Sequence, residues 1–370
     1  MSSPTLALVA GETSGDLLAA HVIAALPNKP SMAGIGGPRL AELGFDAWWP
    51  SERLAVRGYV EVLRHLPGIL RIRRDLRERL LQSPPKLFLG IDAPDFNLKL
   101  EESLKAAGIP TVHFVSPSVW AWRAERMAQI KRAVDHMLCV FPFEPALYAQ
   151  HQMRATYVGH PLADVISLED KRPLLRAVLN LGATETIVAL LPGSREAEVR
   201  FLLPVFLQAA RLLQARLPQV QFLLPVAHAG LRAQIEREAQ LEGLHVLQGR
   251  SHEALGACNA ALVASGTATL EAALFKRPMV IAYRMPWLSW RMTQPKRLQP
   301  FVGLPNILCG EFVVPEFLQE ACTPQALCDG LLTQLSDAAA ARLEPRFTQL
   351  HHELRQGCAA QAAKVIEGYL

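Results

Sequence analysis

The sequence predicts two doubly wound α/β domains, each built on a parallel sheet of the Rossmann type. Short apolar runs alternate with helical stretches along the chain, which is typical of βαβ units. The two halves also open alike, because an apolar run, a glycine loop and a helical stretch follow one another at residues 5–26 and again at residues 186–217. The length of 370 residues exceeds what one hydrophobic core usually holds.

The expected strands follow from these apolar runs. The first half has strands at Thr5–Ala10, Met32–Ile35, Leu87–Ile91, Thr111–Val115 and His136–Phe141. The second half has strands at Thr186–Leu191, Val220–Leu224, His245–Leu247, Ala260–Ala264 and Pro278–Tyr283. Because ligands bind beyond the carboxyl ends of parallel strands, we expect the loops after several of these runs to face a cleft between the domains.

The domain boundary is predicted between Gly159 and Pro173, where hydrophobic periodicity pauses and prolines and charges gather. We therefore divide the chain into an N-terminal domain at residues 1–165, a C-terminal domain at residues 166–345 and a helical tail at residues 346–370. The tail is expected to pack on the N-terminal domain or on a partner subunit.

Composition excludes several classes of protein. Half the residues are hydrophobic and 19% are charged, which is typical of a globular chain. A net charge of +4 is too small to indicate a nucleic-acid partner. No apolar run is long enough for a transmembrane helix, and the N-terminus lacks a basic signal-peptide region, so a cytoplasmic location is expected. The six cysteines are scattered without a C-x-x-C pair, which indicates reduced thiols and no structural zinc.

Two loops of the second half have the features of a nucleotide site. Ser265-Gly266-Thr267 follows an apolar run and opens a helix, where free N–H groups favour a diphosphate, and Glu271 is placed to take ribose hydroxyls. An ordinary serine cap and a surface glutamate are the alternative. In the other loop Ser194 and Arg195 can hold phosphate oxygens or the base.

The alternative for Arg195 is a surface ion pair with Glu198. Neither loop matches the phosphate loop of kinases or the G-x-G-x-x-G turn of dehydrogenases, which disfavours both classes. A nucleotide-sugar site remains.

The first half carries candidates for acid–base chemistry. Asp92 and Asp95 lie at the end of a predicted strand, where Asp92 suits a general base acting on a sugar hydroxyl and Asp95 suits its orientation. Helix capping is the alternative, above all for Asp95. Glu12 and Asp16, which flank the first glycine loop, and His113, in a predicted strand, are further candidates for acceptor contact, although a lone strand histidine is more often an interior one.

Aromatic and basic segments suggest contact with an amphiphile. Trp120 and Trp122 suit such a ligand, with core packing as the alternative. Segment 54–82 has apolar residues at helical spacing and seven arginines against three acidic residues, a pattern typical either of a membrane-binding helix or of a core helix with a solvated face. Segment 284–297 carries four basic residues, no acidic ones and two tryptophans, and suits an anionic lipid or a protein contact.

Six motifs, in this order, resemble those of the lipid-A-disaccharide synthase family, and the resemblance covers essentially the whole chain. They are Ala-Gly-Glu-Thr-Ser-Gly-Asp at residues 10–16, Gly-Ile-Asp-Ala-Pro-Asp-Phe-Asn at 90–97, Val-Ser-Pro-Ser-Val-Trp-Ala-Trp-Arg at 115–123, Leu-Pro-Gly-Ser-Arg at 191–195, Ala-Ser-Gly-Thr-Ala-Thr-Leu-Glu at 264–271 and Leu-Pro-Asn-Ile-Leu at 304–308.

The resemblance implies a GT-B glycosyltransferase of Gram-negative bacteria. It would join UDP-2,3-diacylglucosamine to 2,3-diacylglucosamine 1-phosphate with inversion, releasing UDP and a β-1,6 tetraacyl disaccharide 1-phosphate. The N-terminal domain would face the acceptor and the membrane, and the C-terminal domain would bind the UDP-sugar. Inversion needs in-line attack, a base and stabilisation of the departing UDP.

Roles carried over from the family fall on matching positions. Asp92 matches the essential aspartate and base, and Asn306 matches an asparagine needed for activity. The UDP loops match Arg195, Ser265, Gly266, Thr267 and Glu271. No metal or cofactor is implied, because helix N-termini and arginine replace a cation at the diphosphate. The family also implies a homodimer and peripheral association with the inner membrane, with contact expected at Val60, Val62, Leu63, Ile69 and Leu70.

Two other classes stay open from the residues. A related enzyme, such as the peptidoglycan UDP-GlcNAc transferase or a UDP-GlcNAc 2-epimerase, would share the phosphate loops but lack the motifs at 90–97 and 115–123. A non-catalytic binder of nucleotide sugars is the second, and loss of Asp92 or Arg195 would have favoured it; both are present.

Overall fold

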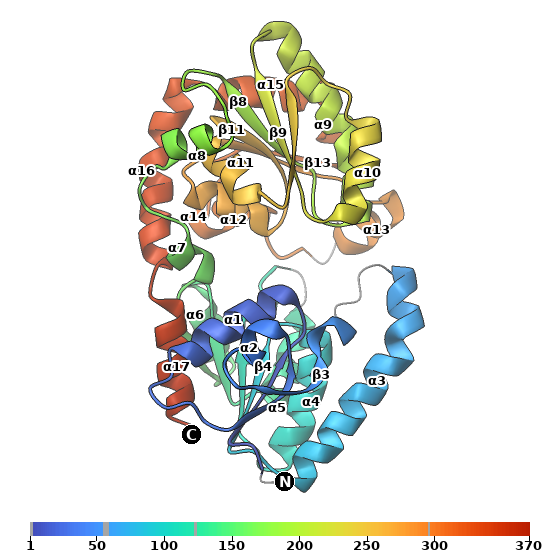
Figure 1. The fold of residues 1–370 in the computed structure, drawn as a ribbon, viewed down its shortest axis with the longest axis vertical. Coiled ribbons are helices and arrows are strands. Elements are labelled where there is room, and N and C mark those ends of the chain that lie inside the picture. Colours follow the sequence, from blue (N-terminus) through green and yellow to red (C-terminus); the bar gives the residue numbers. More distant parts are fainter. Residues whose placement is uncertain (1–2, 55–58, 122–123, 295–296) are drawn as a thin grey trace. The chain divides into compact units, whose positions relative to one another are not determined.

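The computed structural model describes residues 3–54, 59–121, 124–294 and 297–370. The chain forms two compact units (Figure 1). Unit 1 comprises Met1–Asp164 together with Glu353–Leu370, and unit 2 comprises Val165–His352. The prediction of two parallel-sheet α/β domains is confirmed, because each unit contains one twisted sheet whose described strand pairs are all parallel.

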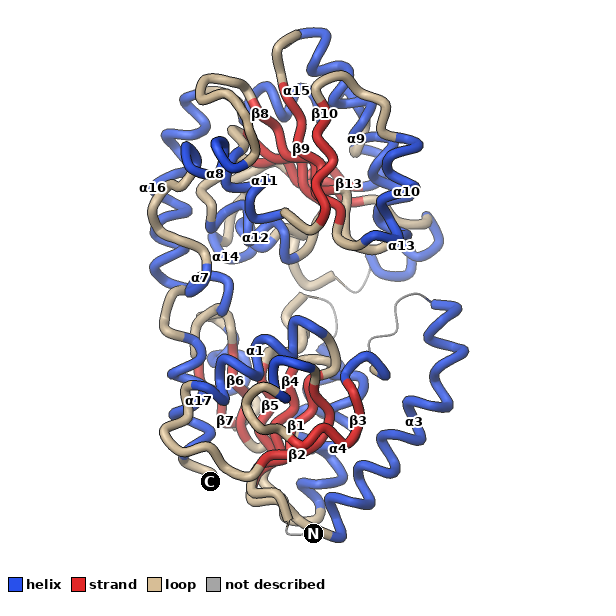
Figure 2. Tube along the Cα trace, viewed as in Figure 1, coloured by secondary structure: helices blue, strands red, loops and turns tan. Residues whose placement is uncertain are grey.

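Unit 1 holds a seven-stranded sheet in the order β3-β2-β1-β4-β5-β6-β7, drawn in red in Figure 2. Its strands are β1 (Leu6–Ala10), β2 (Met32–Gly36), β3 (Asp46–Pro50), β4 (Leu87–Ile91), β5 (Thr111–Phe114), β6 (His136–Cys139) and β7 (Arg154–Tyr157). The central strands β1, β4 and β5 are buried along their whole length. Such near-continuous apolar runs are typical of a parallel sheet covered by helices on both faces.

The helices of unit 1 are α1 (Thr13–Ala24), α2 (Pro38–Ala41), α3 (Tyr59–Gln82), α4 (Pro94–Ala106), α5 (Met127–Ala133), α6 (Glu144–Gln150), α7 (Pro161–Val165), which crosses the unit boundary, and α17 (Cys358–Glu367). Helices α3 and α4 cover one face of the sheet, with Leu76, Leu80 and Leu100 in the core. The C-terminal helix α17 packs beside α1 (Figure 1). Asp164 fixes its start by accepting hydrogen bonds from the N–H groups of Gly357 and Cys358.

Unit 2 holds a six-stranded sheet in the order β10-β9-β8-β11-β12-β13. Its strands are β8 (Ile187–Leu191), β9 (Gln221–Val226), β10 (Leu244–Gln248), β11 (Ala260–Ala264), β12 (Met279–Tyr283) and β13 (Glu316–Leu318). Its helices are α8 (Arg172–Val178), α9 (Glu196–Arg216), α10 (Ala229–Glu238), α11 (Ser251–Ala257), α12 (Thr267–Leu274), α13 (Trp287–Thr293), α14 (Leu304–Cys309), α15 (Pro324–Gln334) and α16 (Asp337–Leu354), whose last residues belong to unit 1. Val199, Phe206 and Leu327 help form the main core.

All ten strands expected from the sequence are present, with ends shifted by up to two residues. Three strands were not expected, namely β3, β7 and β13, and each is the edge strand of its sheet. These three strands are partly or fully exposed and carry polar residues, so they lack the continuous apolar run that marks a buried strand. Helix α3 continues through Pro67, where the sequence left a pair of helices possible.

Each sheet has one point where the strand order reverses, between β1 and β4 in unit 1 and between β8 and β11 in unit 2. The loops that follow these strands therefore meet at the carboxyl edge of the sheet. In unit 1 the meeting is close, since a Cβ added to Gly11 would lie 3.2 Å from the Cβ of Ala93. Among the described helices, none is both long and apolar enough to cross a bilayer.

Asp16 has a structural role in unit 1. Its carboxylate is 1% exposed and accepts hydrogen bonds from the N–H groups of Gly37 at 2.7 Å, Arg39 at 2.9 Å and Leu40 at 3.3 Å. These are orphan donors at the start of α2, and α2 has no cap from its own N-cap residue. The carboxylate on α1 therefore anchors the loop that follows β2, and Asp16, expected as a candidate for acceptor contact, is buried in this structural role.

Replacing Asp16 with alanine should lower the free energy of unfolding of unit 1 by about 2–4 kcal/mol, because three N–H groups lose their acceptor. Urea unfolding followed by circular dichroism measures the change. Glu42→Gln is the control, since Glu42 is exposed and pairs only with exposed Arg39 in the described contacts; its effect should stay within about 0.5 kcal/mol. Equal stability of the two variants would contradict this role for Asp16.

Candidate functional site

A cavity of about 470 Å³ opens in unit 2 at the carboxyl ends of β8, β9 and β11. The starts of α9, α11 and α12 complete its wall. The structure brings together here all six residues that the sequence assigned to a nucleotide, which are Ser194, Arg195, Ser265, Gly266, Thr267 and Glu271. A concave site of this volume is typical for a small-molecule ligand.

The start of α12 offers this cavity backbone donors. Gly266 precedes the helix with φ 150°, a conformation that side chains disfavour, and no side-chain cap covers the helix start. The hydroxyl of Thr269 instead turns back to the carbonyl of Gly266 at 2.8 Å. The N–H of Thr269 bonds the same carbonyl at 3.1 Å. The N–H groups of Thr267 and Ala268 precede any intrahelical acceptor, which is the geometry of an anion site.

The start of α9 is arranged differently. The carboxylate of Glu198 accepts hydrogen bonds from the N–H groups of Ser194 at 3.1 Å and Arg195 at 3.2 Å. It lies against Gly193, where an added Cβ would come within 2.5 Å of the Cβ of Glu198 and where φ is 122°. The anion-binding end of α9 is thus occupied by a carboxylate of its own helix.

Arg195 combines both alternatives that its sequence context allows. Its guanidinium pairs with Glu198 at 3.1 Å, yet its side chain is 78% exposed and lines the cavity. An exposed pair of this kind contributes little stability, so the guanidinium is free to exchange its partner for a ligand anion.

Asn306 does not line the cavity but lies behind it, fully buried. Its amide donates hydrogen bonds to the carbonyl of Val314 at 2.9 Å and to Glu316 at 2.8 Å, and its oxygen accepts one from the N–H of Val314. Glu316 in turn accepts hydrogen bonds from the N–H groups of Val302 and Gly303.

The hydroxyl of Ser265 donates to the carbonyl of Val302 at 2.8 Å, which completes a chain of contacts from Asn306 to the cavity wall. Sequence reasoning missed Glu316, because it lies on a three-residue edge strand without any motif.

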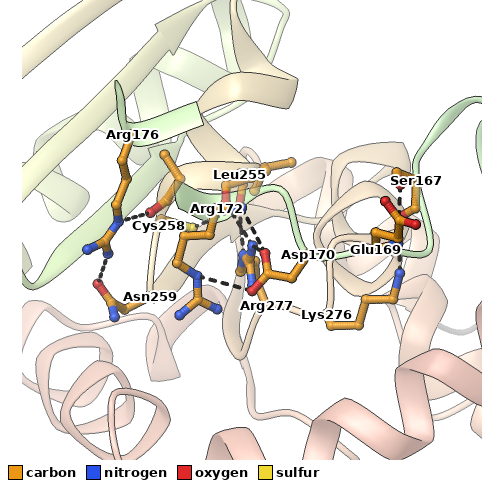
Figure 3. A network of polar contacts seen from close by, with 12 residues as sticks. Ser167, Glu169, Asp170, Arg172, Arg176, Leu255, Cys258, Asn259, Lys276 and Arg277 are labelled. Carbon is orange, nitrogen blue, oxygen red and sulfur yellow. Dashed lines mark hydrogen bonds and ion pairs between the residues drawn. The ribbon is translucent and has the colours of Figure 1, made fainter. Parts of the chain in front are cut away.

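A polar network below the cavity holds the segment that enters unit 2 (Figure 3). The side chain of Arg277 is only 3% exposed. It donates to Asp170 at 2.8 Å and to the carbonyls of Leu255 and Gly256. Lys276 donates to the carbonyl of Ser167. Both cations directly follow α12 and its C-cap residue, so this helix has the cavity at its start and the entering segment at its end.

In unit 1, Asp92 lies at the end of β4 in a turn of left-handed backbone, with φ 50° at Asp92 and 44° at Ala93. Its N–H donates to the carbonyl of Phe114 at 2.9 Å, and its carbonyl accepts from the side chain of Asn97 at 2.8 Å. The carboxylate itself is exposed. Hydrogen bonds to the backbone therefore fix the turn and leave the side chain available.

The remaining acid–base candidates have different surroundings. Asp95 is in the first turn of α4, caps no helix and forms an ion pair with Arg126. Glu12 is exposed and is the N-cap residue of α1. His113 is fully buried, and its Nδ1 lies 2.8 Å from the carboxylate of Glu101. Burial opposes the charged imidazole, but Glu101 and the charge of Asp92 raise the pKa of His113.

Glu144 is a buried carboxyl that sequence reasoning missed. It accepts hydrogen bonds from the indole of Trp120 at 3.0 Å and from the N–H groups of Val140 and Phe141. Burial raises the pKa of Glu144 to about 7. The contact holds the segment after β5 against α6, where Trp120 packs edge-on to Phe141; Trp122 lies outside the described residues.

The buried carboxyl of Glu144 should make the stability of unit 1 depend on pH. The unfolded chain releases this proton near pH 4.5, while the folded unit keeps it to about pH 7, so stability should fall as pH rises through that interval by about 3 kcal/mol. Glu144→Gln should remove this dependence, and exposed Glu125→Gln should keep it. Urea unfolding at several pH values measures it, and parallel curves for wild type and Glu144→Gln would refute the assignment.

Helix α3 divides into a packed side and an exposed side. Ile69 packs against the core, whereas Leu66 and Leu70 are 40% and 42% exposed. A hollow of about 390 Å³ between α3 and α4 is lined by Leu70, Arg73, Arg74, Arg77, Lys99, Leu100, Glu102 and Ser103. The side chains of Val60, Val62 and Leu63 lie outside the described part of the structure.

Helix α13 carries the exposed residues of the second basic segment. Trp287 is 61% and Met292 is 66% exposed, and the guanidinium of Arg291 lies 5.1 Å from the ring centre of Trp287. An exposed apolar residue beside a cation is typical of interfaces with lipid or protein.

Comparison with known proteins gives one consistent family. The model of the lipid-A-disaccharide synthetase family matches residues 6–366. A lipid-A-disaccharide synthase of Thiobacillus denitrificans is 56% identical over 98% of this chain and 99% of its own length. One from Verminephrobacter eiseniae is 54% identical over 99% of this chain and 97% of its own length.

Solved structures resemble the chain in fold. A glycotransferase of kitacinnamycin has a TM-score of 0.65 at 17% identity and covers 100% of this chain and 99% of its own. The UDP-GlcNAc 2-epimerase of Neisseria meningitidis, solved with UDP-GlcNAc, has a TM-score of 0.65 at 12% identity and covers 98% of both chains. At such identities the likeness extends to the fold alone.

Proposed function

Because this chain belongs to the lipid-A-disaccharide synthase family, we propose that its unit 2 holds the UDP of a sugar donor and its unit 1 supplies the base. The chain is a GT-B glycosyltransferase of lipid A biosynthesis. It condenses UDP-2,3-diacylglucosamine with 2,3-diacylglucosamine 1-phosphate to a β-1,6 tetraacyl disaccharide 1-phosphate and UDP. The observation that carries the site assignment is the convergence of six predicted residues on one cavity of unit 2.

The diphosphate is assigned to the start of α12 rather than α9. Glu198 already occupies the backbone donors before α9, whereas α12 begins without a side-chain cap. The helix dipole and free N–H groups there stabilise the charge that develops on departing UDP. Glu271, at the start of the second turn of α12 and with 18% side-chain exposure, takes the ribose hydroxyls. Arg195 turns from Glu198 to the phosphates or the base.

Asp92 is assigned as the base. The acceptor 6-hydroxyl attacks the anomeric carbon in line, its proton passes to the Asp92 carboxylate, and the bond between that carbon and the diphosphate oxygen breaks with its electrons leaving on UDP. A carboxylate at a rigid turn suits this step, because the hydrogen bonds from Asn97 and to Phe114 fix the backbone without using the side chain.

Asn306 is assigned a supporting role. Through Glu316 it holds the segment at Val302 and Gly303, and this segment accepts the hydrogen bond of Ser265 at the cavity wall. The asparagine thereby keeps the loop before α12 in place.

The acceptor is a lipid, and we assign α3 to contact with the membrane surface. Exposed Leu66 and Leu70 suit the acyl region, and the basic hollow beside them suits anionic headgroups. The exposed residues of α13 add a second apolar and basic surface. We further propose that the chain associates peripherally with the inner membrane and forms a homodimer.

UDP release tests the reaction and both assignments. The wild type should release UDP from UDP-2,3-diacylglucosamine only when 2,3-diacylglucosamine 1-phosphate is present. Asp92→Asn should abolish turnover and leave UDP affinity within about threefold, because the base is lost without a nucleotide contact. Arg195→Ala should weaken UDP binding about tenfold, as expected for a lost charge-assisted contact.

Calorimetric UDP titration separates the two variants. Turnover retained by Asp92→Asn removes this residue as the base, and unchanged affinity in Arg195→Ala moves the nucleotide elsewhere. Release of UDP without acceptor would favour the epimerase or hydrolase chemistry of related folds.

The membrane assignment has its own test on the intact chain. Leu66→Ser combined with Leu70→Ser should weaken binding to vesicles containing anionic phospholipid by about tenfold, because two exposed apolar side chains are lost. Leu81→Ser is a matched control, since Leu81 is also 40% exposed but lies at the far end of α3. Co-sedimentation measures both, and equal binding of both variants would return α3 to a purely structural role.

A further inference from the structure

His252 lies at the wall between the nucleotide cavity and a neighbouring hollow. It follows Ser251, which lines the cavity, and it lines with Glu253 a second hollow of about 290 Å³. Its Nε2 lies 3.7 Å from the Oε1 of Glu271. The cavity residue assigned to the ribose thus has a histidine as its ionic partner.

The position of His252 is fixed by the scaffold. Its ring packs edge-on to Phe275, the residue after α12, with ring centres 5.6 Å apart. Arg277 donates to the carbonyl of Leu255 at 3.0 Å and of Gly256 at 2.7 Å, which ties α11 to the end of α12 (Figure 3). A Cβ added to Gly256 would meet the side-chain end of Leu175 and would lie 3.3 Å from the ring of Phe275, so α11 packs closely here.

Because α11 and α12 are bound together at their ends, the distance between His252 and Glu271 is set by packed backbone. It does not depend on two mobile surface side chains finding each other. The pair is also partly shielded, with side-chain exposures of 39% for His252 and 18% for Glu271.

The charges around His252 favour its imidazolium form. The nearby carboxylate of Glu271 raises the pKa of His252, burial opposes this, and the charge of Glu253 raises it further. The hollow is also lined by Glu169, Asp170, Lys171, Lys276 and Arg277. Two of these cations already have partners, because Arg277 binds Asp170 and Lys276 binds the carbonyls of Ser167 and Leu168.

We propose that His252, as the imidazolium, is a positioning residue that orients the Glu271 carboxylate toward the ribose hydroxyls of UDP. The inference rests on the proposed nucleotide site. One carboxylate oxygen faces the imidazolium, which leaves the other for the ligand. Since the raised pKa keeps the cation below that pKa and loses it above, the contribution of His252 to UDP affinity should disappear as pH rises from the ordinary histidine value of 6.5 into the alkaline range.

UDP titrations of the intact chain at about pH 6 and about pH 9 test this. His252→Gln should bind UDP about three- to fivefold more weakly than wild type at the lower pH and about equally at the higher pH. UDP itself titrates in this range, but the ratio of the two dissociation constants cancels that effect. His252→Arg should keep the wild-type affinity of the lower pH and retain the advantage over His252→Gln at both, because guanidinium stays charged.

His245→Gln is the matched control, an exposed histidine of the same unit that contacts Gln221 outside the cavity, and it should bind like wild type. A loss in His252→Gln that is equal at both pH values and not rescued by arginine would reduce His252 to a structural residue and overturn the proposal. Wild-type affinity in His252→Gln, with a loss in Arg195→Ala, would overturn this inference alone. Failure of the wild type to bind UDP would overturn the nucleotide site and this inference together.

Discussion

The reversal of strand order in each sheet is the constraint on which the candidate sites depend. In unit 2 it places β8 and β11 side by side and parallel, so the loop before α9 and the loop before α12 face one cavity although they lie about 70 residues apart. In unit 1 the same arrangement of β1 and β4 brings Gly11 against Ala93, beside Asp92. One topological rule thus positions the residues assigned to both substrates.

The two helix starts at the proposed nucleotide cavity illustrate how similar sequences acquire different roles. Both follow a buried strand, and a glycine of positive φ lies in the loop before each helix, Gly193 before α9 and Gly266 before α12. At α9 the carboxylate of Glu198 satisfies the backbone donors, whereas α12 has threonines and alanine in its first turn and no side-chain cap. An anion therefore gains more at α12, because it does not have to displace a carboxylate. The surrounding contacts from Ser265 to Asn306 preserve this open geometry.

Local patterns in the sequence predicted the central strands, and the loops that end them supplied the six residues that line one cavity of unit 2. The assignment of a nucleotide to that cavity stays a proposal. What the sequence did not indicate depends on contacts between distant segments. Glu316 lies on an edge strand and Glu144 is the first residue of an ordinary-looking helix, yet each accepts several buried or partly buried hydrogen bonds. The sequence also did not indicate the pair of His252 and Glu271, because this pair requires α11 to pack against α12. No spacing rule within one segment can predict such pairs.

Contacts between distant segments also fix the turn of the proposed base in unit 1. Glu101 and His113 are fully buried and paired, and the carboxylate occupies the space that a side chain at Gly90 would need. A buried ion pair recovers little of its desolvation cost, so it contributes little net stability. It nevertheless constrains the geometry, because separating the two groups leaves a buried charge without a partner. Glu101 lies one helical turn after Asn97, which binds the carbonyl of Asp92. The pair therefore helps to hold α4 in the register that fixes the Asp92 turn, whose left-handed backbone is supported by the hydrogen bonds from Asn97 and to Phe114.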